Sequence, residues 1–218
     1  TWHTVATRDV RLLKKQLDIV NGLPKDYVFL NYLRCHDDIG WGLDYATLQQ
    51  EGIEERSHKK YLNDYFQGFA GESNSRGVLY NEDPVTGDAR FCGTTASMCG
   101  IEKAGFEKNK MAMEKAIQLD VMLHAYMFMQ SGIPVIYSGD EIGQVNDYSY
   151  KNDPDKAPDS RYIHRGAMNW DRAAMSGNAR TVEGKLNKRL LQLEKIRKTE
   201  KAFMTNADTW TVDTWDNS

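Results

Sequence analysis

The stretch "FLNYLRCHDDIGW", residues 29–41, joins an apolar run to three consecutive ionisable side chains. The run "YVFLNYLRC" (27–35) is short, partly aromatic and β-branched, and apolar on both sides of its alternation. This pattern predicts a strand that is buried on both faces, as in a parallel sheet. His36, Asp37 and Asp38 follow at once, where α/β proteins commonly carry functional side chains. The alternative is a solvated polar loop in which His36 caps a helix or packs against neighbouring side chains.

A second apolar strand is predicted further along the chain. "IPVIYS" (133–138) has the same character, and the turn "GDE" (139–141) follows it directly. A long helix that is apolar nearly all round begins at Lys110, is expected to end at Gly132, and precedes it. Strands that alternate with helices indicate a parallel sheet, and in (β/α) barrels the catalytic residues lie at the carboxyl ends of the strands. The alternative for this turn is that Asp140 or Glu141 only caps backbone amides.

Three further helices are predicted from helical spacing of apolar residues. They are expected at 7–24, capped by Thr7 or Asp9 and ended by Gly22, at 56–69, and at 183–203. Residues 42–107 are otherwise rich in turn-forming residues and too long for a structureless loop, so we interpret them as an inserted subdomain. The tail 208–218 alternates like strands.

Composition limits the classes of function. The formal net charge is −3 over 218 residues, which gives no footprint for nucleic acid, and no apolar run approaches the length of a membrane span. The three cysteines lack CxxC spacing and are interpreted as reduced thiols. The compartment stays open: the cytoplasm is favoured weakly, and secretion is not excluded because the chain begins at Thr1, not at a methionine.

The sequence offers few signals for a cofactor. It contains no glycine-rich phosphate loop and no GxSxG elbow. Asp153, Asp155 and Asp159 resemble a calcium loop at first sight, but the EF-hand glycine and glutamate are missing, so a structural calcium ion is not favoured. Asp159 and Arg161 are suited instead to a charge-assisted contact at a pocket. We expect no metal and no cofactor, because no metal-ligand spacing links the remaining histidines His58, His124 and His164, and His124 is expected in the core.

Several stretches resemble a known enzyme family. "YLRCHDD" (32–38) resembles the fourth signature region of the α-amylase superfamily of glycoside hydrolases, and "SGIPVIYSGDEIG" (131–143) resembles its last barrel strand and the following turn. "RGVLYNEDPVTGDARFCGTTAS" (76–97) and "GDEIGQVNDYSYKNDPDKAPDSRYIHR" (139–165) are similar to amylosucrase and the related sucrose hydrolases. The resemblance covers nearly the whole chain.

The resemblance implies an α/β fold, the C-terminal part of a TIM (β/α)8 barrel. Residues 1–201 would belong to the barrel, with 29–35 as strand seven and 133–138 as strand eight. The subdomain inserted after strand seven would be 42–107, and 202–218 would begin a C-terminal β-domain.

The resemblance also implies a retaining reaction in which sucrose donates a glucosyl group to an α-1,4-glucan or to water, and fructose leaves. By carry-over, Asp37 is the catalytic transition-state stabiliser and His36 binds the same sugar. Asp38 and Arg90 match substrate-binding positions around the fructosyl or acceptor subsite. Arg161 matches the arginine that closes the pocket by pairing with an aspartate far upstream.

The departures from the family pattern bear on activity. The family's nucleophile follows strand four and its acid/base follows strand five, and neither stretch is present in these residues. We therefore predict no turnover by the 218 residues alone, and poor solubility because sheet edges stay unpaired.

Two alternatives remain open. One is another superfamily member: a sucrose hydrolase, an α-glucosidase or a trehalose-type isomerase. The other is a non-catalytic carbohydrate-binding barrel remnant, whose aromatic residues would stack on sugars instead of packing in the core: Trp41, Tyr61, Tyr65, Phe66 and Tyr80.

Overall fold

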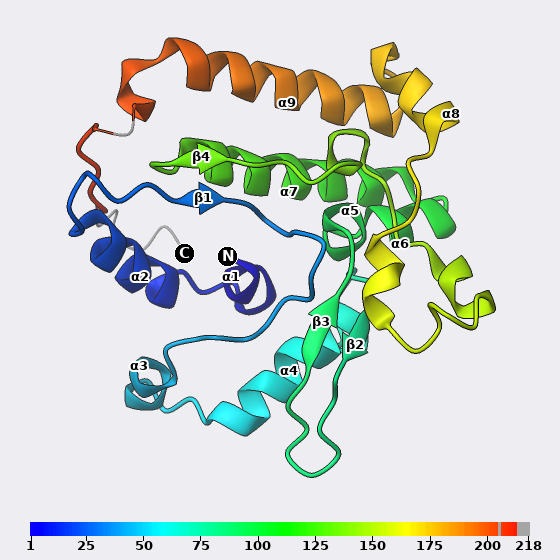
Figure 1. Cartoon of the computed structure of the whole chain (residues 1–218), viewed down its shortest axis with the longest axis horizontal. Coiled ribbons are helices and arrows are strands. Elements are labelled where there is room, and N and C mark those ends of the chain that lie inside the picture. Colours follow the sequence, from blue (N-terminus) through cyan, green and yellow to red (C-terminus); the bar gives the residue numbers. More distant parts are fainter. Residues whose placement is uncertain (205, 213–218) are drawn as a thin grey trace.

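The chain folds into a mixed α/β structure that is rich in helix (Figure 1). The computed structural model describes residues 1–204 and 206–212. Its helices are α1 (Trp2–Thr7), α2 (Arg11–Asn21), α3 (Tyr45–Gln50), α4 (Glu55–Gln67), α5 (Thr95–Met98), α6 (Ile101–Phe106), α7 (Lys110–Met129), α8 (Trp170–Ala173) and α9 (Val182–Thr199). Its strands are β1 (Leu30–Asn31), β2 (Val78–Tyr80), β3 (Arg90–Cys92) and β4 (Ile133–Pro134), and short 3₁₀ turns include η1 (Asp140–Ile142) and η3 (Ser160–His164).

The two predicted apolar strands lie side by side and run parallel. β1 pairs with β4, with Leu30 opposite Ile133, and α7 lies between them in the chain. The amide of Ile133 donates to the carbonyl of Phe29 at 2.7 Å, and the amide of Val135 donates to that of Asn31 at 2.8 Å. The predicted parallel pairing of two strands with an intervening helix is therefore confirmed, although the ladder is shorter than the predicted strands.

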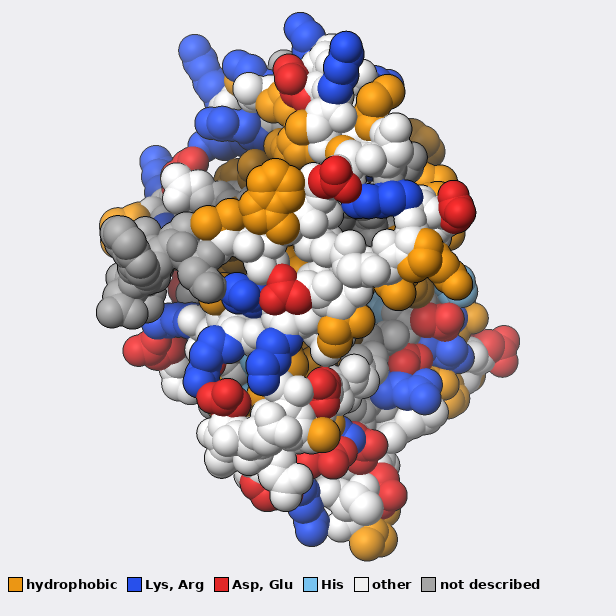
Figure 2. Space-filling model, turned by 90° about the vertical axis from the view of Figure 1, so that its left-hand side faces the viewer, with side chains coloured by type: hydrophobic (Ala, Val, Ile, Leu, Met, Phe, Trp, Pro, Cys, Tyr) orange, Lys and Arg blue, Asp and Glu red, His pale blue; other side chains and the backbone are white. Residues whose placement is uncertain are grey.

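The prediction that these strands are buried on both faces is wrong. Leu30 is 64% exposed, Tyr32 53% and Ile133 51%. Within the described part of the chain no third strand pairs with β1 or β4, so the outer edge and one face stay uncovered. The side of the molecule that carries α2 and the segment leading to β1 shows hydrophobic side chains among Lys and Arg side chains (Figure 2). Apolar side chains on both sides of a strand show that both faces are suited to burial. They do not show that both faces are covered in this structure.

The helix predicted at 7–24 is present as α2, and a short helix that was not predicted, α1, precedes it. Arg8 takes a left-handed conformation (φ 57°) and ends α1, and α2 starts at Arg11. The prediction that Thr7 or Asp9 is the N-cap is wrong, because Val10 holds that position without a side-chain hydrogen bond. The Asp9 carboxylate nevertheless accepts the amide of Arg11, the first helical residue, at 2.9 Å. The predicted end at Gly22 is confirmed.

The segment 42–107 forms α3, α4, α5 and α6 and an antiparallel hairpin of β2 and β3. An isolated bridge between Ile39 and Phe91 ties the hairpin to the polar stretch that follows β1. Side chains of this segment also enter the main core, as Phe66 and Phe91 do with no exposed surface. The insertion is thus packed into the body of the molecule and does not stand apart from it.

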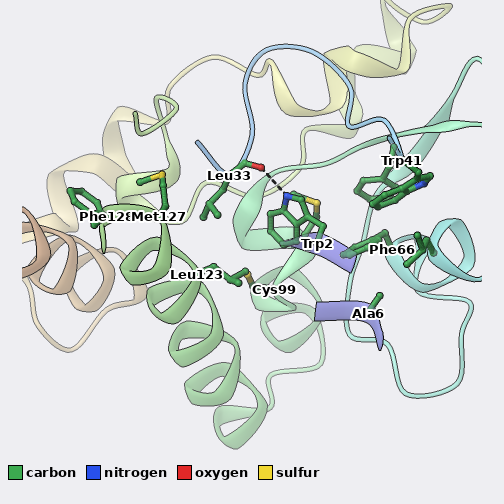
Figure 3. Close-up of a cluster of buried hydrophobic side chains, with 12 residues drawn as sticks. Trp2, Ala6, Leu33, Trp41, Phe66, Cys99, Leu123, Met127 and Phe128 are labelled. Carbon is green, nitrogen blue, oxygen red and sulfur yellow. Dashed lines mark hydrogen bonds between the residues drawn. The ribbon is translucent and has the colours of Figure 1, made fainter. Parts of the chain in front are cut away.

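One buried cluster joins the N-terminus, the polar end of β1 and the insertion (Figure 3). Trp41 stacks on Phe66 with ring centroids 5.4 Å apart, and both side chains are buried, so these two aromatic residues belong to the core. The indole nitrogen of Trp2 donates to the carbonyl of Leu33 at 2.8 Å, drawn as a dashed line in Figure 3. The backbone immediately before Arg34 is therefore held in place by a side chain of α1.

Trp2→Phe is expected to lower the free energy of unfolding by about 1–3 kcal/mol, because it leaves the buried carbonyl of Leu33 without its donor. Urea unfolding followed by far-UV circular dichroism measures the change. Trp210→Phe is the matched control, since Trp210 is 74% exposed and should leave stability unaltered. Equal stability of the two variants would contradict a structural role for the indole N–H.

Residues 207–209 lie beside α2 and the residues that follow it. The ammonium group of Lys25 donates to the carbonyl of Ala207 at 2.9 Å, and the Thr209 hydroxyl donates to the Asn21 side chain at 2.7 Å. Within the predicted β-domain segment 202–218, residues 202–204 and 206–212 contain no strand, and Thr205 and residues 213–218 lie outside the described residues. Among the helices that the structure describes, none combines the length and apolar character needed to cross a bilayer.

Candidate functional site

A cluster of charged side chains forms where β1 gives way to the stretch 35–39. The chain bends at His36 and Asp37, and the Cys35 sulfur accepts the amide of Asp37 at 3.4 Å. Because of this bend, the adjacent side chains reach the same spot: His36 Nε2 lies 3.5 Å from the Asp37 carboxylate. Both side chains are open to solvent, with His36 68% and Asp37 50% exposed, so a ligand can reach them.

Two arginines from the η3 segment meet the Asp37 carboxylate. Arg161 Nη1 lies 3.2 Å from Asp37 Oδ1, and Arg165 Nη2 lies 3.3 Å from the same oxygen. The structure thus brings three predicted site residues, His36, Asp37 and Arg161, into one cluster. It adds Arg165, which the sequence analysis missed. Two guanidinium groups so close to one carboxylate hold its oxygens in place and partly balance its charge.

Arg161 has a second acidic partner. Its Nε and Nη2 lie 2.9 Å from the two oxygens of Asp159, and its guanidinium stands 4.7 Å from the centre of the Tyr80 ring. The predicted charge-assisted contact between Asp159 and Arg161 is confirmed. Hydrogen bonding to Arg161 lowers the pKa of Asp159 below its ordinary value and raises the pKa of Arg161. In the part of the chain that the structure describes, the acidic partners of Arg161 are therefore Asp159 and Asp37, and its predicted pairing with an upstream aspartate stays a prediction.

The last two predicted residues, Asp38 and Arg90, form a neighbouring pair. Arg90 Nη1 lies 3.3 Å from Asp38 Oδ2; the Asp38 side chain is 8% exposed and that of Arg90 59%. The pairing follows from the backbone, because Ile39 and Phe91 exchange hydrogen bonds of 2.8 and 2.9 Å. All five predicted site residues thus lie at the polar end of β1 or on the segments that pack against it, and their roles in binding stay predictions.

Beneath the cluster lies a buried ion pair that the sequence analysis did not identify. Arg34 Nε and Nη2 donate to Asp140 Oδ1 at 2.9 and 2.7 Å, and both side chains are only 2% exposed. The Thr95 hydroxyl donates to Asp140 Oδ2 at 2.9 Å, and the Arg34 guanidinium stands 4.3 Å from the centre of the Tyr137 ring. The alternative that Asp140 or Glu141 caps backbone amides after β4 holds for one of the two residues. Asp140 does not cap the turn, because its carboxylate is bound by Arg34 and Thr95. Glu141 caps it by accepting the amide of Gly139 at 2.7 Å.

His164 connects η3 to the backbone of the cluster. Its ring is buried, and its Nε2 lies 3.1 Å from the carbonyl oxygen of His36. Arg165 Nε donates to the same carbonyl at 2.6 Å. Burial lowers the pKa of His164 to about 4, with smaller effects from the nearby charges of Arg34, Arg165 and Asp38 and from the hydrogen bond to His36.

This lowered pKa predicts a loss of stability in acid. The unfolded chain takes up a proton at His164 near pH 6.5, whereas the folded protein does so only near pH 4. The free energy of unfolding should therefore fall by roughly 3 kcal/mol as the pH is lowered through this window. Urea unfolding of wild type and His164→Gln at several pH values measures this, and the variant should show the smaller pH dependence. The exposed His36→Gln is the control, and an identical slope in all three proteins would contradict the assignment.

The other candidate groups do not form a metal or redox site within residues 1–204 and 206–212. No three His, Cys, Asp or Glu side chains there are arranged to hold a metal ion, and the three cysteines are free thiols, as predicted. Asp153 pairs with Lys156 at 2.7 Å in the loop that resembled a calcium site. His124 is buried against Asp120, with 2.9 Å between Nδ1 and Oδ1, so it is a core residue as predicted.

A groove of about 570 Å³ between α1 and α7 shares no residue with the charged cluster. Its lining is mostly apolar and includes Val5, Leu119, Met122 and Leu123. The cluster at the polar end of β1 gathers carboxylate, imidazole and guanidinium groups at solvent-accessible positions, so it is the better candidate for a site of chemistry.

Comparison with known proteins supports the fold. No family model matches the chain. A solved structure, sucrose 6F-phosphate phosphorylase from Thermoanaerobacter thermosaccharolyticum, matches with a TM-score of 0.59 at 18% sequence identity. The match covers 93% of this chain and 35% of that one, so the chain spans about a third of its length. Nearly all of this chain therefore shares its fold with part of a sucrose-phosphate phosphorylase.

Proposed function

We propose that these residues form part of an α-amylase superfamily enzyme that transfers a glucosyl group from sucrose, or hydrolyses it, with retention at the anomeric carbon. Within that superfamily we propose an amylosucrase-like reaction, in which an α-1,4-glucan accepts the glucosyl group and fructose is released. The observation that carries the proposal is the contact of Asp37 with His36 and Arg161 at the polar end of a parallel strand.

The cluster suits the stabilising half of such a reaction. In a retaining glycosidase the sugar passes through an oxocarbenium-like transition state, which a nearby carboxylate stabilises by its charge. Asp37 would supply that carboxylate, with its orientation held by Arg161 and Arg165. His36 would donate a hydrogen bond to the same sugar. The attacking carboxylate and the proton donor would come from residues outside these 218, and the reaction requires no cofactor.

The neighbouring pair of Asp38 and Arg90 would contact the leaving group or the acceptor. Arg90 is largely exposed and stands on β3, beside the cluster, so it is available to a second sugar. The similarity in fold to an enzyme named for a phosphorylated sucrose supports a sucrose-type substrate. The non-catalytic alternative is weakened because Trp41 and Phe66, two of the aromatic residues it requires at the surface, are buried.

Incubation of the complete polypeptide with sucrose tests the proposal. Insoluble α-glucan with free fructose would support the amylosucrase-like reaction, whereas equal glucose and fructose would indicate a hydrolase. A third outcome, phosphorolysis, is tested by a parallel reaction with inorganic phosphate, in which a phosphorylase would release glucose 1-phosphate. The 218 residues alone should give no product in any reaction. Failure of the complete polypeptide to convert sucrose in both incubations would refute the proposal.

A further inference from the structure

We propose that Arg34, Asp140 and His164 form a buried support that positions the peptide of His36 and Asp37, and that His164 acts in it as a neutral hydrogen-bond donor. None of the three is expected to touch the substrate, so they are positioning residues. Their effect on turnover rests on the proposed function, whereas their effect on the geometry of the cluster does not.

The support begins with the ion pair between the two strand ends. Arg34 follows β1 and Asp140 follows β4, and they join at 2.7 Å with almost no exposure to water. Arg34 Nη1 also approaches the carbonyl of His164 at 3.4 Å. The guanidinium thus holds three segments together, because the η3 segment is attached to the same group that links the strand ends.

The second step leads from His164 to the cluster. The carbonyl oxygen of His36 can only accept a hydrogen bond, so His164 Nε2, 3.1 Å away, must carry the proton. The remaining nitrogen, Nδ1, is buried and has no hydrogen-bond partner in the described part of the chain. A proton on Nδ1 would then be desolvated without an acceptor, which fixes both the neutral state and the tautomer.

The third step concerns what the donor fixes. The carbonyl of His36 receives Arg165 Nε as well as His164 Nε2, and it belongs to the peptide bond that continues into Asp37. A different nitrogen of Arg165, Nη2, contacts the Asp37 carboxylate. Two donors on one carbonyl leave this peptide little freedom to rotate, although the side chains on either side of it remain exposed. The site therefore combines open side chains with a fixed backbone.

The test uses two substitutions at one position. His164→Gln retains a side-chain N–H that can reach the His36 carbonyl, whereas His164→Met fills a similar volume without a donor. Nitrogen NMR of the wild type should show the Nε2–H tautomer of His164. The amide shifts of His36, Asp37 and Asp38 should move in the Met variant and largely recover in the Gln variant.

In the complete enzyme, His164→Met should lower kcat on sucrose about 10- to 100-fold, because catalysis is sensitive to displacements of about 1 Å. KM should change little, and His164→Gln should restore kcat to within a few-fold of the wild type. His58→Met is the matched control: its Nε2 is also buried without a hydrogen-bond partner among the described residues, but it is absent from the cluster. Its kcat should be unaltered even if its melting temperature falls.

An Nδ1–H tautomer in the wild type, or unmoved amide shifts in His164→Met, would overturn the positioning role. So would equal kcat for the Met and wild-type enzymes. A wild-type enzyme that converts no sucrose would instead refute the proposed function, while the tautomer and the amide shifts would still decide the inference.

Discussion

Asp37→Asn is expected to lower kcat of the complete enzyme on sucrose by about 100- to 1,000-fold or more, the range seen when a transition-state-stabilising group is removed. Asparagine has the same shape, and its side-chain oxygen can still accept from Arg161 and Arg165, so the cluster should keep its geometry. What is lost is the negative charge that, in the proposed reaction, would stabilise the oxocarbenium-like transition state. Initial rates give kcat, and the melting temperature should stay near that of the wild type.

Asp155→Asn is the matched control for this substitution. Asp155 is exposed in the loop before η3 and lies outside the charged cluster, so the same chemical change should leave kcat unaltered. Near-normal activity of Asp37→Asn would overturn its assignment as the transition-state stabiliser.

Arg34→Met is expected to lower the free energy of unfolding by about 3–5 kcal/mol, the cost of leaving one member of a buried ion pair without its partner. Asp140 would remain 2% exposed, with Thr95 as its other side-chain donor. Urea unfolding measures the loss. Because the same guanidinium supports His164, activity should also fall.

Two further variants separate the ion pair from a general effect of removing an arginine. The double substitution Arg34→Met with Asp140→Asn removes both charges and should recover part of the stability, as a double-mutant cycle would show. Arg8→Met is the control: Arg8 pairs with Glu72 at 2.9 Å, but the two side chains are 73% and 79% exposed. Such an exposed pair contributes little. Equal losses for Arg8→Met and Arg34→Met would contradict the role given to burial.

The position of the charged cluster could be predicted where it depends on local order along the chain. The change from an apolar run to His36, Asp37 and Asp38 comes shortly after β1, which ends at Asn31, and a similar change at 139–141 comes shortly after β4, which ends at Pro134. Two parallel neighbours bring their carboxyl ends to one edge of a sheet, so a charged cluster at that edge follows from the pattern. The assignment of Arg90 and Arg161 to the same region came from family resemblance, because nothing in their own spacing indicates it.

Features that depend on distant partners escaped prediction. Arg34 and Asp140 are 106 positions apart, and His164 meets the backbone of His36 from 128 positions away. A guanidinium within an apolar run signals a buried partner, but it does not say which acid supplies it. The strands β2 and β3 have three residues each, too few to show an alternating pattern. The exposure of β1 was missed because burial depends on the neighbours of a strand as well as on its own side chains.

The β2–β3 hairpin has a consequence for how such a site can diversify. Its turn, residues 81–88, is exposed throughout, while its base is anchored by the bridge from Phe91 to Ile39. Mutations in the turn therefore leave the anchor undisturbed, yet they alter the surroundings of Arg90 at the start of β3. Point changes in one surface turn can thus alter the environment of Arg90 without changing the charged residues at the end of β1.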